Sequence, residues 1–144
     1  MKSNVITTAV LTLIGLIFSI GPMTLTVQAD AIKWYPYEEG MTIGKIEKKK
    51  IFLHFFSERC RYCEQMDNET FKNEPVVSYL NKFFIPIRVN SEKNRELAAK
   101  YKVMGLPDTW FLAGNGEVIG NRTGYINPKM LMKIFEYVKT ASVN

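Results

Sequence analysis

Two cysteines lie close together between an apolar run and a segment with helical character. Cys60 and Cys63 are separated by Arg61 and Tyr62, and they are the only cysteines among the 144 residues. The nearly continuous apolar run at 51–56 is typical of a central strand that is buried on both faces. A helix that begins at Cys60 or Arg61 would place one sulfur at the helix start and the other one turn later. The stretch therefore predicts a strand, a short connection and a helix with a dithiol in its first turn.

A dithiol in this position suits thiol–disulfide exchange. The free backbone N–H groups and the macrodipole at a helix start favour the thiolate of Cys60. The flanking Arg59 and Arg61 favour the thiolate as well. We therefore predict that Cys60 attacks a disulfide of a partner and that Cys63 resolves the mixed disulfide by intramolecular attack.

Two other uses of a cysteine pair fit this chain less well. A structural disulfide stabilises a protein most when it closes a long loop, and this pair encloses two residues. A structural zinc site takes four soft ligands, whereas the chain offers two cysteines and one histidine. We therefore expect redox chemistry at the sulfurs, with no metal and no cofactor.

The start of the chain differs from everything that follows. Lys2 precedes an uncharged apolar run at 5–27, and Val27-Gln28-Ala29 has the small residues that a signal peptidase requires. We expect 1–29 to be a signal peptide cleaved after Ala29, and 30–144 to be one domain. The run also exceeds the roughly 20 residues that span a bilayer, so an uncleaved anchor is the alternative. Both place the folded part in the periplasm or otherwise outside the cytoplasm.

The charge of the chain does not favour a nucleic-acid partner. The net charge of +5 at pH 7 is dispersed, with acidic residues interleaved among the basic ones. Lys48-Lys49-Lys50 is the only basic run, and we interpret it as a solvated turn before a strand. With 47% hydrophobic residues, a chain of this length can bury one core.

The rest of the chain predicts alternating strands and helices. Beyond the strand at 51–56 and the helix from 60 or 61 to 71, the expected elements are a helix at 73–81, a strand at 83–89, a helix from 90 or 91 to 101, strands at 108–113 and 117–122, and a helix that begins at Asn127 and Pro128. Parallel strands joined by helices and followed by an antiparallel pair give an α/β fold with a mixed sheet covered on both faces.

Three local features qualify this pattern. Gly114-Asn115-Gly116 is a strong hairpin signal between the last two strands. Gly40 and Gly44 weaken the helix predicted at 38–47, because each costs a helix up to about 1 kcal/mol. Pro86 argues for a bend or an unpaired amide within its strand.

Together these motifs resemble the thioredoxin superfamily, and more narrowly the extracytoplasmic group that includes the C-terminal domain of the electron transporter DsbD. The resemblance rests on the strand before Cys60-Arg-Tyr-Cys63, on Gly105-Leu106-Pro107, on the hairpin and on Gly124-Tyr125. It covers nearly everything after residue 29. It implies the thioredoxin fold, a central mixed β-sheet with helices on both faces, and thiol–disulfide oxidoreductase activity.

The resemblance also implies further site residues. Pro107 matches the proline that has a cis peptide bond in this family and packs against the active-site cysteines. The backbone of Leu106 would then pair with a bound client strand. Arg61 and Tyr62 lie in the dipeptide that tunes redox poise, and we assign them, with Leu106, to substrate binding.

The sequence departs from the family at several positions. His54 occupies the strand position where thioredoxins usually carry a buried acid, and Arg88 falls where they carry its lysine partner. His54 is either a neutral base for the proton of Cys63 or a core histidine hydrogen-bonded to backbone. Asp108 replaces a threonine, and it either faces the sulfurs as the missing carboxylate or points to solvent. Arg59 replaces a common tryptophan.

The leading function is an exported thiol–disulfide oxidoreductase that reduces protein disulfides or relays electrons from a membrane partner of the DsbD type. A disulfide oxidase or isomerase is the alternative within this class. A second class is a non-catalytic peptide-binding or assembly factor, in which the cysteines would be incidental.

Overall fold

A mixed sheet forms the centre of the computed structural model, which describes residues 31–141. In spatial order, the strands are β2 (Phe84–Asn90), β1 (Lys50–Phe56), β3 (Asp108–Leu112) and β4 (Val118–Thr123). β1 and β2 run parallel, whereas β3 is antiparallel to both β1 and β4. The strands predicted from the sequence are confirmed to within one residue at each end. The predicted signal peptide, residues 1–29, lies outside the described residues.

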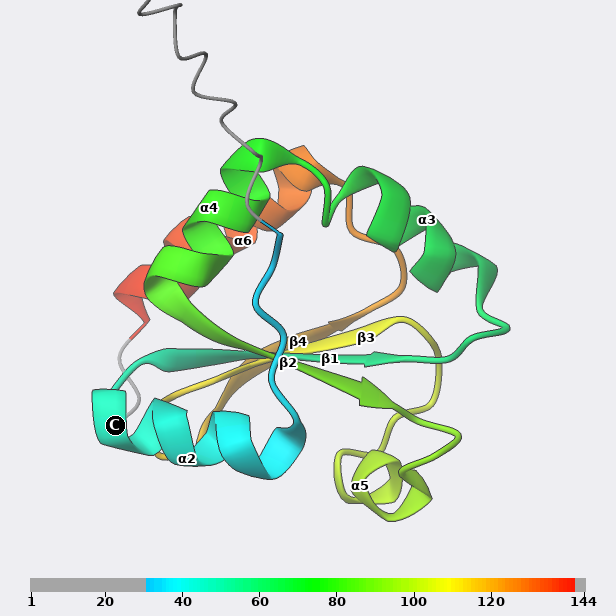
Figure 1. The fold of residues 1–144 in the computed structure, drawn as a ribbon, viewed down its shortest axis with the longest axis horizontal. Coiled ribbons are helices and arrows are strands. Elements are labelled where there is room, and N and C mark those ends of the chain that lie inside the picture. The colour runs from blue at the N-terminus through cyan, green and yellow to red at the C-terminus, as the bar shows by residue number, and fades with distance from the viewer. Residues whose placement is uncertain (1–30, 142–144) are drawn as a thin grey trace, which may run out of the picture.

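Helices cover both faces of this sheet (Figure 1). The first face is covered by α3 (Arg61–Glu69), α4 (Glu74–Phe83) and α6 (Pro128–Thr140). The second face is covered by α2 (Tyr37–Glu47) and α5 (Arg95–Lys100). The predicted fold class, α/β with helices on both faces of a mixed sheet, is confirmed. Within 31–141, no helix is long and apolar enough to cross a membrane.

Burial on both faces explains why the central strand β1 is almost entirely apolar. Ile51, Leu53 and Phe55 belong to the core of the second face, and Phe52 belongs to the core of the first face. His54 lies on the same face as Phe52, and the two rings stack with their centroids 6.2 Å apart. A strand with both faces buried cannot alternate polar and apolar residues.

The glycines of α2 let this helix approach the sheet closely. A Cβ atom at Gly40 would lie 2.3 Å from Cγ1 of Ile87, and one at Gly44 would lie 2.8 Å from Cδ1 of Ile51. The helix predicted weakly at 38–47 is therefore present, and close packing against the sheet offsets its low intrinsic propensity.

Pro86 is accommodated because β2 is an edge strand. The Pro86 carbonyl accepts a hydrogen bond from Tyr35 N–H at 2.8 Å, and Arg88 N–H donates to the Tyr35 carbonyl at 3.3 Å. The nitrogens of Pro86 and Arg88 point to the same side of the strand, so the missing amide hydrogen faces the sheet edge. Pairing with β1 stays in register, which favours the unpaired amide over the bend.

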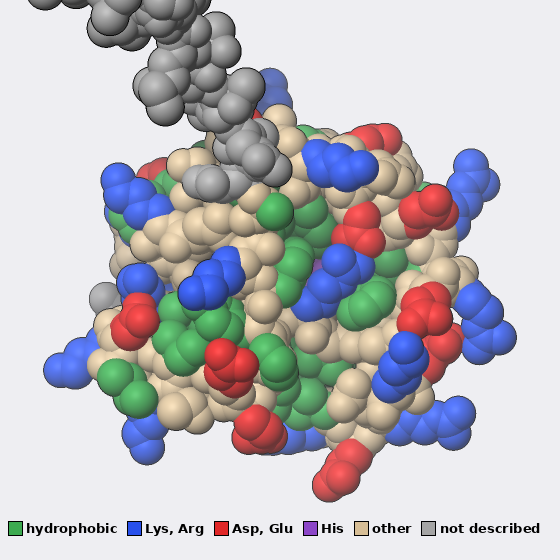
Figure 2. All heavy atoms as spheres, in the orientation of Figure 1, with side chains coloured by type: hydrophobic (Ala, Val, Ile, Leu, Met, Phe, Trp, Pro, Cys, Tyr) green, Lys and Arg blue, Asp and Glu red, His purple; other side chains and the backbone are tan. Residues whose placement is uncertain are grey.

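The basic run is not simply a solvated turn, so that interpretation is wrong for Lys50. Its ammonium donates to the carbonyls of Val138, Lys139 and Ala141 at 2.6, 2.9 and 2.9 Å. These are the orphan carbonyls at the end of α6, where a cation is favourable. Elsewhere, basic and acidic side chains are interspersed over the face in Figure 2.

The helix α5 begins later than predicted. The side-chain oxygen of Asn90 accepts the N–H groups of Glu92 and Lys93 at 3.0 and 3.2 Å. This Asx turn holds the chain after β2 in a loop before the helix starts at Arg95. Asn90 therefore stabilises a turn and does not cap the helix.

Candidate active site

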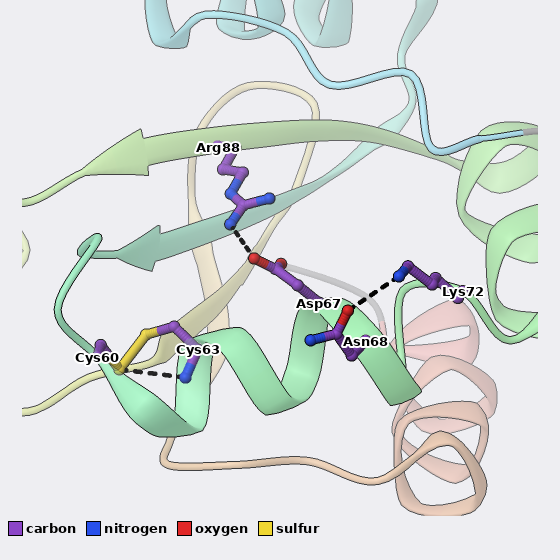
Figure 3. Close-up of polar contacts among 6 residues, drawn as sticks. All are labelled: Cys60, Cys63, Asp67, Asn68, Lys72 and Arg88. Carbon is purple, nitrogen blue, oxygen red and sulfur yellow. Dashed lines mark hydrogen bonds and ion pairs between the residues drawn. A yellow bond between two sulfur atoms is a disulfide. The ribbon is translucent and has the colours of Figure 1, made fainter.

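A disulfide joins Cys60 and Cys63 at the start of α3 (Figure 3). Cys60 is the N-cap residue, and its sulfur accepts a hydrogen bond from the N–H of Cys63 at 3.2 Å. Cys60 is partly exposed, whereas Cys63 is only 1% exposed. A partner can therefore approach the first sulfur, while the second is shielded by the protein.

Two exposed ion pairs hold the loop that carries Cys60. Glu58 pairs with Lys93 at 2.7 Å, and Arg59 pairs with Glu92 at 3.0 Å, so the loop is linked to the one before α5. The hydrogen bond from Lys93 lowers the pKa of the Glu58 carboxyl. Glu58 and Arg59 thus each have an opposite charge beside them, and their effects on a thiolate are partly balanced.

The Leu106–Pro107 peptide bond is cis, as the family resemblance implies. Pro107 is buried and directly precedes Asp108, which pairs with Phe55 near the end of β1. The proline therefore lies at the same end of the sheet as the disulfide. Its carbonyl accepts the N–H of Gly124 at 2.7 Å. Within 31–141, Leu106 makes no backbone hydrogen bond, so its N–H and carbonyl are free to pair with another strand.

His54 is a fully buried, neutral histidine. Its Nδ1 lies 3.0 Å from Oγ1 of Thr109, and its Nε2 has no hydrogen-bond partner among the described residues. Burial, and secondly the positive charge of Arg88, lower the pKa of His54 to about 3. Its partner is a side-chain hydroxyl, so the prediction that a core histidine here would bond to backbone is wrong.

An ion pair joins α3 to β2 beside this histidine. Arg88 pairs with His54 in the strand register, and its Nη2 lies 2.6 Å from Oδ2 of Asp67. Asp67 follows Cys63 by one helical turn, and Figure 3 shows its carboxylate directed at Arg88. Oδ1 of Asp67 and Nε of Arg88 are both buried, and neither has a hydrogen-bond partner among the described residues.

Asp67 is the residue that sequence reasoning missed. Its spacing of four from Cys63 puts the two side chains on neighbouring positions of one helix face, and this was the available signal. The pairing with Arg88 could not be read in the same way, because it depends on how α3 packs on the sheet.

Neither alternative predicted for Asp108 holds. The side chain is 1% exposed, so it does not point to solvent. Its Oδ1 accepts from the hydroxyl of Thr123 at 2.8 Å, and its Oδ2 accepts from Nε1 of Trp110 at 2.9 Å. Asp108 also pairs with Phe55, which belongs to the second face, whereas α3 covers the first. The carboxylate therefore holds the β3–β4 pair together and is not the missing acid.

A family model described as a thioredoxin-like domain matches residues 37–139. The chain belongs to the thioredoxin-like domain family. Relatives of this thioredoxin-like chain include proteins named for disulfide exchange. The Disulfide bond reductase DsbH of Chlamydia pneumoniae is 25% identical over 114 residues, which cover 71% of this chain and 68% of that protein. The Thiol:disulfide interchange protein DsbD of Vibrio vulnificus is 28% identical over 111 residues, covering 72% and 19%.

Other relatives are much longer than this chain. Spermatogenesis-associated protein 20 of Rattus norvegicus is 31% identical over 81 residues, covering 56% of this chain and 10% of that protein. The chain thus spans about a tenth of that relative's length. Among solved structures, a thioredoxin from Thermus thermophilus matches with a TM-score of 0.70 at 28% identity, covering 77% of this chain and 89% of that one. The Cys60–Cys63 pair is therefore the CxxC disulfide of a thioredoxin-like disulfide oxidoreductase family.

The two residues between the cysteines are open to solvent. Tyr62 is 59% exposed, and Arg61 is exposed without an ion pair to any described residue. Both side chains are accessible to a partner that reaches the sulfur of Cys60. Among residues 31–141, no three histidine, cysteine, aspartate or glutamate side chains come together as a metal site would need.

Proposed function

We propose that this thioredoxin-like protein is an exported reductase of protein disulfides, with Cys60 as the nucleophile and Cys63 as the resolving thiol. The observation that carries the proposal is the disulfide at the start of α3, with one cysteine partly exposed and the other buried. This asymmetry suits a cycle in which the first sulfur meets the client and the second acts only within the protein.

The cycle starts from the dithiol form. The Cys60 thiolate attacks one sulfur of a client disulfide, forms a mixed disulfide, and releases the other client sulfur as a thiolate. The Cys63 thiolate then attacks Sγ of Cys60, which releases the second client thiolate and forms the Cys60–Cys63 disulfide. Two electrons pass from the dithiol to the client, and the two client thiolates take up two protons.

Client binding is assigned to the surface around the disulfide. The free backbone groups of Leu106 suit the addition of an extended client strand, and the cis Pro107 shapes this edge. The exposed side chains of Arg61 and Tyr62 would contact the client on the other side of the sulfur.

The resolving step needs an acceptor for the proton of Cys63. His54 is one candidate, but it is fully buried and its Nδ1 lies 3.0 Å from Oγ1 of Thr109. Asp67 is the second candidate, because it lies one turn from Cys63 and has an unpartnered buried oxygen. We assign the proton to Asp67 and give His54 a positioning role through its contact with Thr109.

The direction and the electron source rest on the relatives and on the expected signal peptide. Relatives are named as a disulfide bond reductase and as a thiol:disulfide interchange protein, which favours reduction over oxidation. An exported reductant has no access to cytosolic donors, so we propose that a membrane protein of the DsbD type reduces it.

One experiment tests the direction. The reduction potential of the Cys60–Cys63 pair is measured together with the reduction of insulin by the purified protein. A reductase is expected near about −270 mV with activity, whereas an oxidase would lie near about −120 mV. A potential at the oxidising end would reverse the proposal in favour of an oxidase or isomerase.

A peptide-binding or assembly factor is the second candidate, and the free edge at Leu106 favours it. In that case Cys60→Ser would leave the biological role intact. For a reductase, the same variant abolishes it, because no mixed disulfide can form.

A further inference from the structure

A groove lies between α5 and the loop that leads to Pro107. Its volume is about 580 Å³, and apolar side chains that include Ala98, Val103 and Leu106 line it. Figure 1 shows α5 at the same end of the sheet as the loop from β1 to α3, which carries the disulfide. The groove therefore lies at the same end of the sheet as the disulfide, and the bond-exchange steps themselves do not use it.

Leu106 connects this groove to the edge proposed for client binding. The same residue lines the groove and offers free backbone groups to a client strand. A strand that pairs at Leu106 spans about 3.3 Å per residue, so a few more residues carry it along the groove. The occupant is thus the part of a client polypeptide that flanks its reacting cysteine.

Arg95 is the charged side chain of the groove. It makes no ion pair with any described residue, whereas the neighbouring Glu92 and Lys93 are paired with Arg59 and Glu58. Ser91 also lines the groove, but its hydroxyl oxygen is buried, which leaves Arg95 as the polar group that a client can reach there. A guanidinium without an ion-pair partner is complementary to a carboxylate.

Met104 adds an apolar contact at the rim. Its side chain is 94% exposed, although it lies three residues before Pro107 and lines the groove. A methionine is flexible and polarizable, so it can pack on apolar side chains of different shapes. Met104 therefore extends the apolar lining of the groove to its exposed rim.

We propose that this groove selects client segments in which an acidic and an apolar residue flank the reacting cysteine. The client carboxylate pairs with Arg95, and the apolar side chain packs on Met104 and Val103. This inference rests on the proposed reduction of protein disulfides and names the client chemistry that the site prefers.

The test uses synthetic peptides of identical sequence except at one position. Each peptide holds its cysteine in a disulfide with 2-mercaptoethanol and carries Glu, Gln or Lys at matched positions on either side of that cysteine. Bis(2-hydroxyethyl) disulfide is the small neutral reference, because it is too short to enter the groove. The second-order rate constant of the reduced protein is measured with each substrate at low and high salt.

The Glu peptide is expected to react about two- to fivefold faster than the Gln peptide, the range of an exposed ion pair, and the Lys peptide more slowly. High salt should reduce the difference. Arg95→Glu should reverse the order of the Glu and Lys peptides without changing the rate with the reference. Lys133→Gln removes a comparable exposed charge on α6 and should preserve the wild-type order.

The outcomes separate the two proposals. Equal rates with all three peptides, or an unchanged order in Arg95→Glu, would overturn the groove and leave the reductase standing. A protein that reduces neither the peptides nor the reference overturns both.

Discussion

His54 is a titratable side chain buried where a proton is costly. Burial and Arg88 hold its pKa at about 3, whereas the unfolded chain has an imidazole pKa of about 6.5. Between these values the unfolded state binds a proton that the folded state does not, so stability falls as the pH drops. Because the chain has one histidine, any histidine contribution to the pH dependence of stability comes from His54.

We predict that this proton costs about 3 kcal/mol of stability between pH 7 and pH 4. His54→Gln keeps a polar partner for Thr109 but removes the titration. The free energies of unfolding of both proteins are measured in urea at several pH values. The advantage of the wild type at pH 7 should shrink or reverse toward pH 4. A constant difference at all pH values would show that His54 takes up no extra proton on unfolding.

A second prediction concerns the proton of Cys63. Asp67→Asn should slow resolution of a mixed disulfide by about 100-fold, the low end for a positioned general base, and leave its formation nearly unchanged. His54→Gln should have a much smaller effect on resolution. Quenched-flow measurement of a mixed disulfide with a peptide follows both steps.

Asn68→Ala is the matched control for this experiment. Asn68 follows Asp67 on α3, but its side chain accepts a hydrogen bond from Lys72 at 2.9 Å, away from the sheet (Figure 3). This variant should resolve at the wild-type rate. If His54→Gln slows resolution and Asp67→Asn does not, the proton belongs to the histidine.

The residues of the site differ in how far the sequence could predict them. Cys60 and Cys63 are only three positions apart in the chain, so their spacing and the helix start were enough. The same strand pattern placed His54 in the core. Asp67 was given no role and Asp108 was given the wrong ones, because their partners come from other elements and depend on side-chain direction in three dimensions.

At the scale of elements, α2 shows how packing overrides propensity. Gly40 lies in this helix where a Cβ would be 2.3 Å from Cγ1 of Ile87, a buried side chain of β2. Alanine normally stabilises a helix by up to about 1 kcal/mol over glycine. Here we predict that Gly40→Ala instead destabilises the protein by about 1–3 kcal/mol, because the core is overpacked.

Gly120→Ala is the control for this prediction. A Cβ at Gly120 in β4 would meet nothing within 4 Å, so the substitution should change the free energy of unfolding little. Both variants are compared by urea unfolding. A stabilised Gly40→Ala protein would mean that α2 can move away from the sheet at no cost.

Elements with their own sequence signals were predicted well. Asn127 caps α6 by accepting from Met130 N–H at 2.8 Å, and Pro128 occupies the first turn, as expected. The start of α5 was predicted too early, because Asn90 can serve equally in a cap or in a turn. In the structure it serves in the turn, and the helix begins only at Arg95.

At the scale of the whole molecule, the sheet topology could be predicted from the order of the strands and helices along the chain. Strands separated by helices predicted a parallel pair, and the hairpin at 114–116 predicted the antiparallel addition. The close packing of α2 and the role of Lys50 at the end of α6 join segments far apart in the chain, so local patterns did not reveal them.

The first described residues are packed against the rest of the fold. Asn81 of α4 donates to the carbonyl of Ala31 at 2.9 Å and accepts from Lys33 N–H at 3.0 Å, and Ile32 is buried in the first face. Cleavage after Ala29 would therefore keep residues 31–33 and these contacts in the mature protein.

The final prediction is that cells carrying the full chain release a mature protein whose first residue is Asp30. Intact-mass measurement of the fraction released by osmotic shock identifies this terminus. Ala29→Phe should block cleavage, because signal peptidases require a small residue there, and the precursor should stay with the membrane. A wild-type chain that begins at Met1 in the membrane fraction would favour the anchor, and one that begins at Met1 in the cytoplasm would exclude export. An anchored reductase would meet its electron donor by diffusion within the membrane plane, whereas a released one must find it from solution.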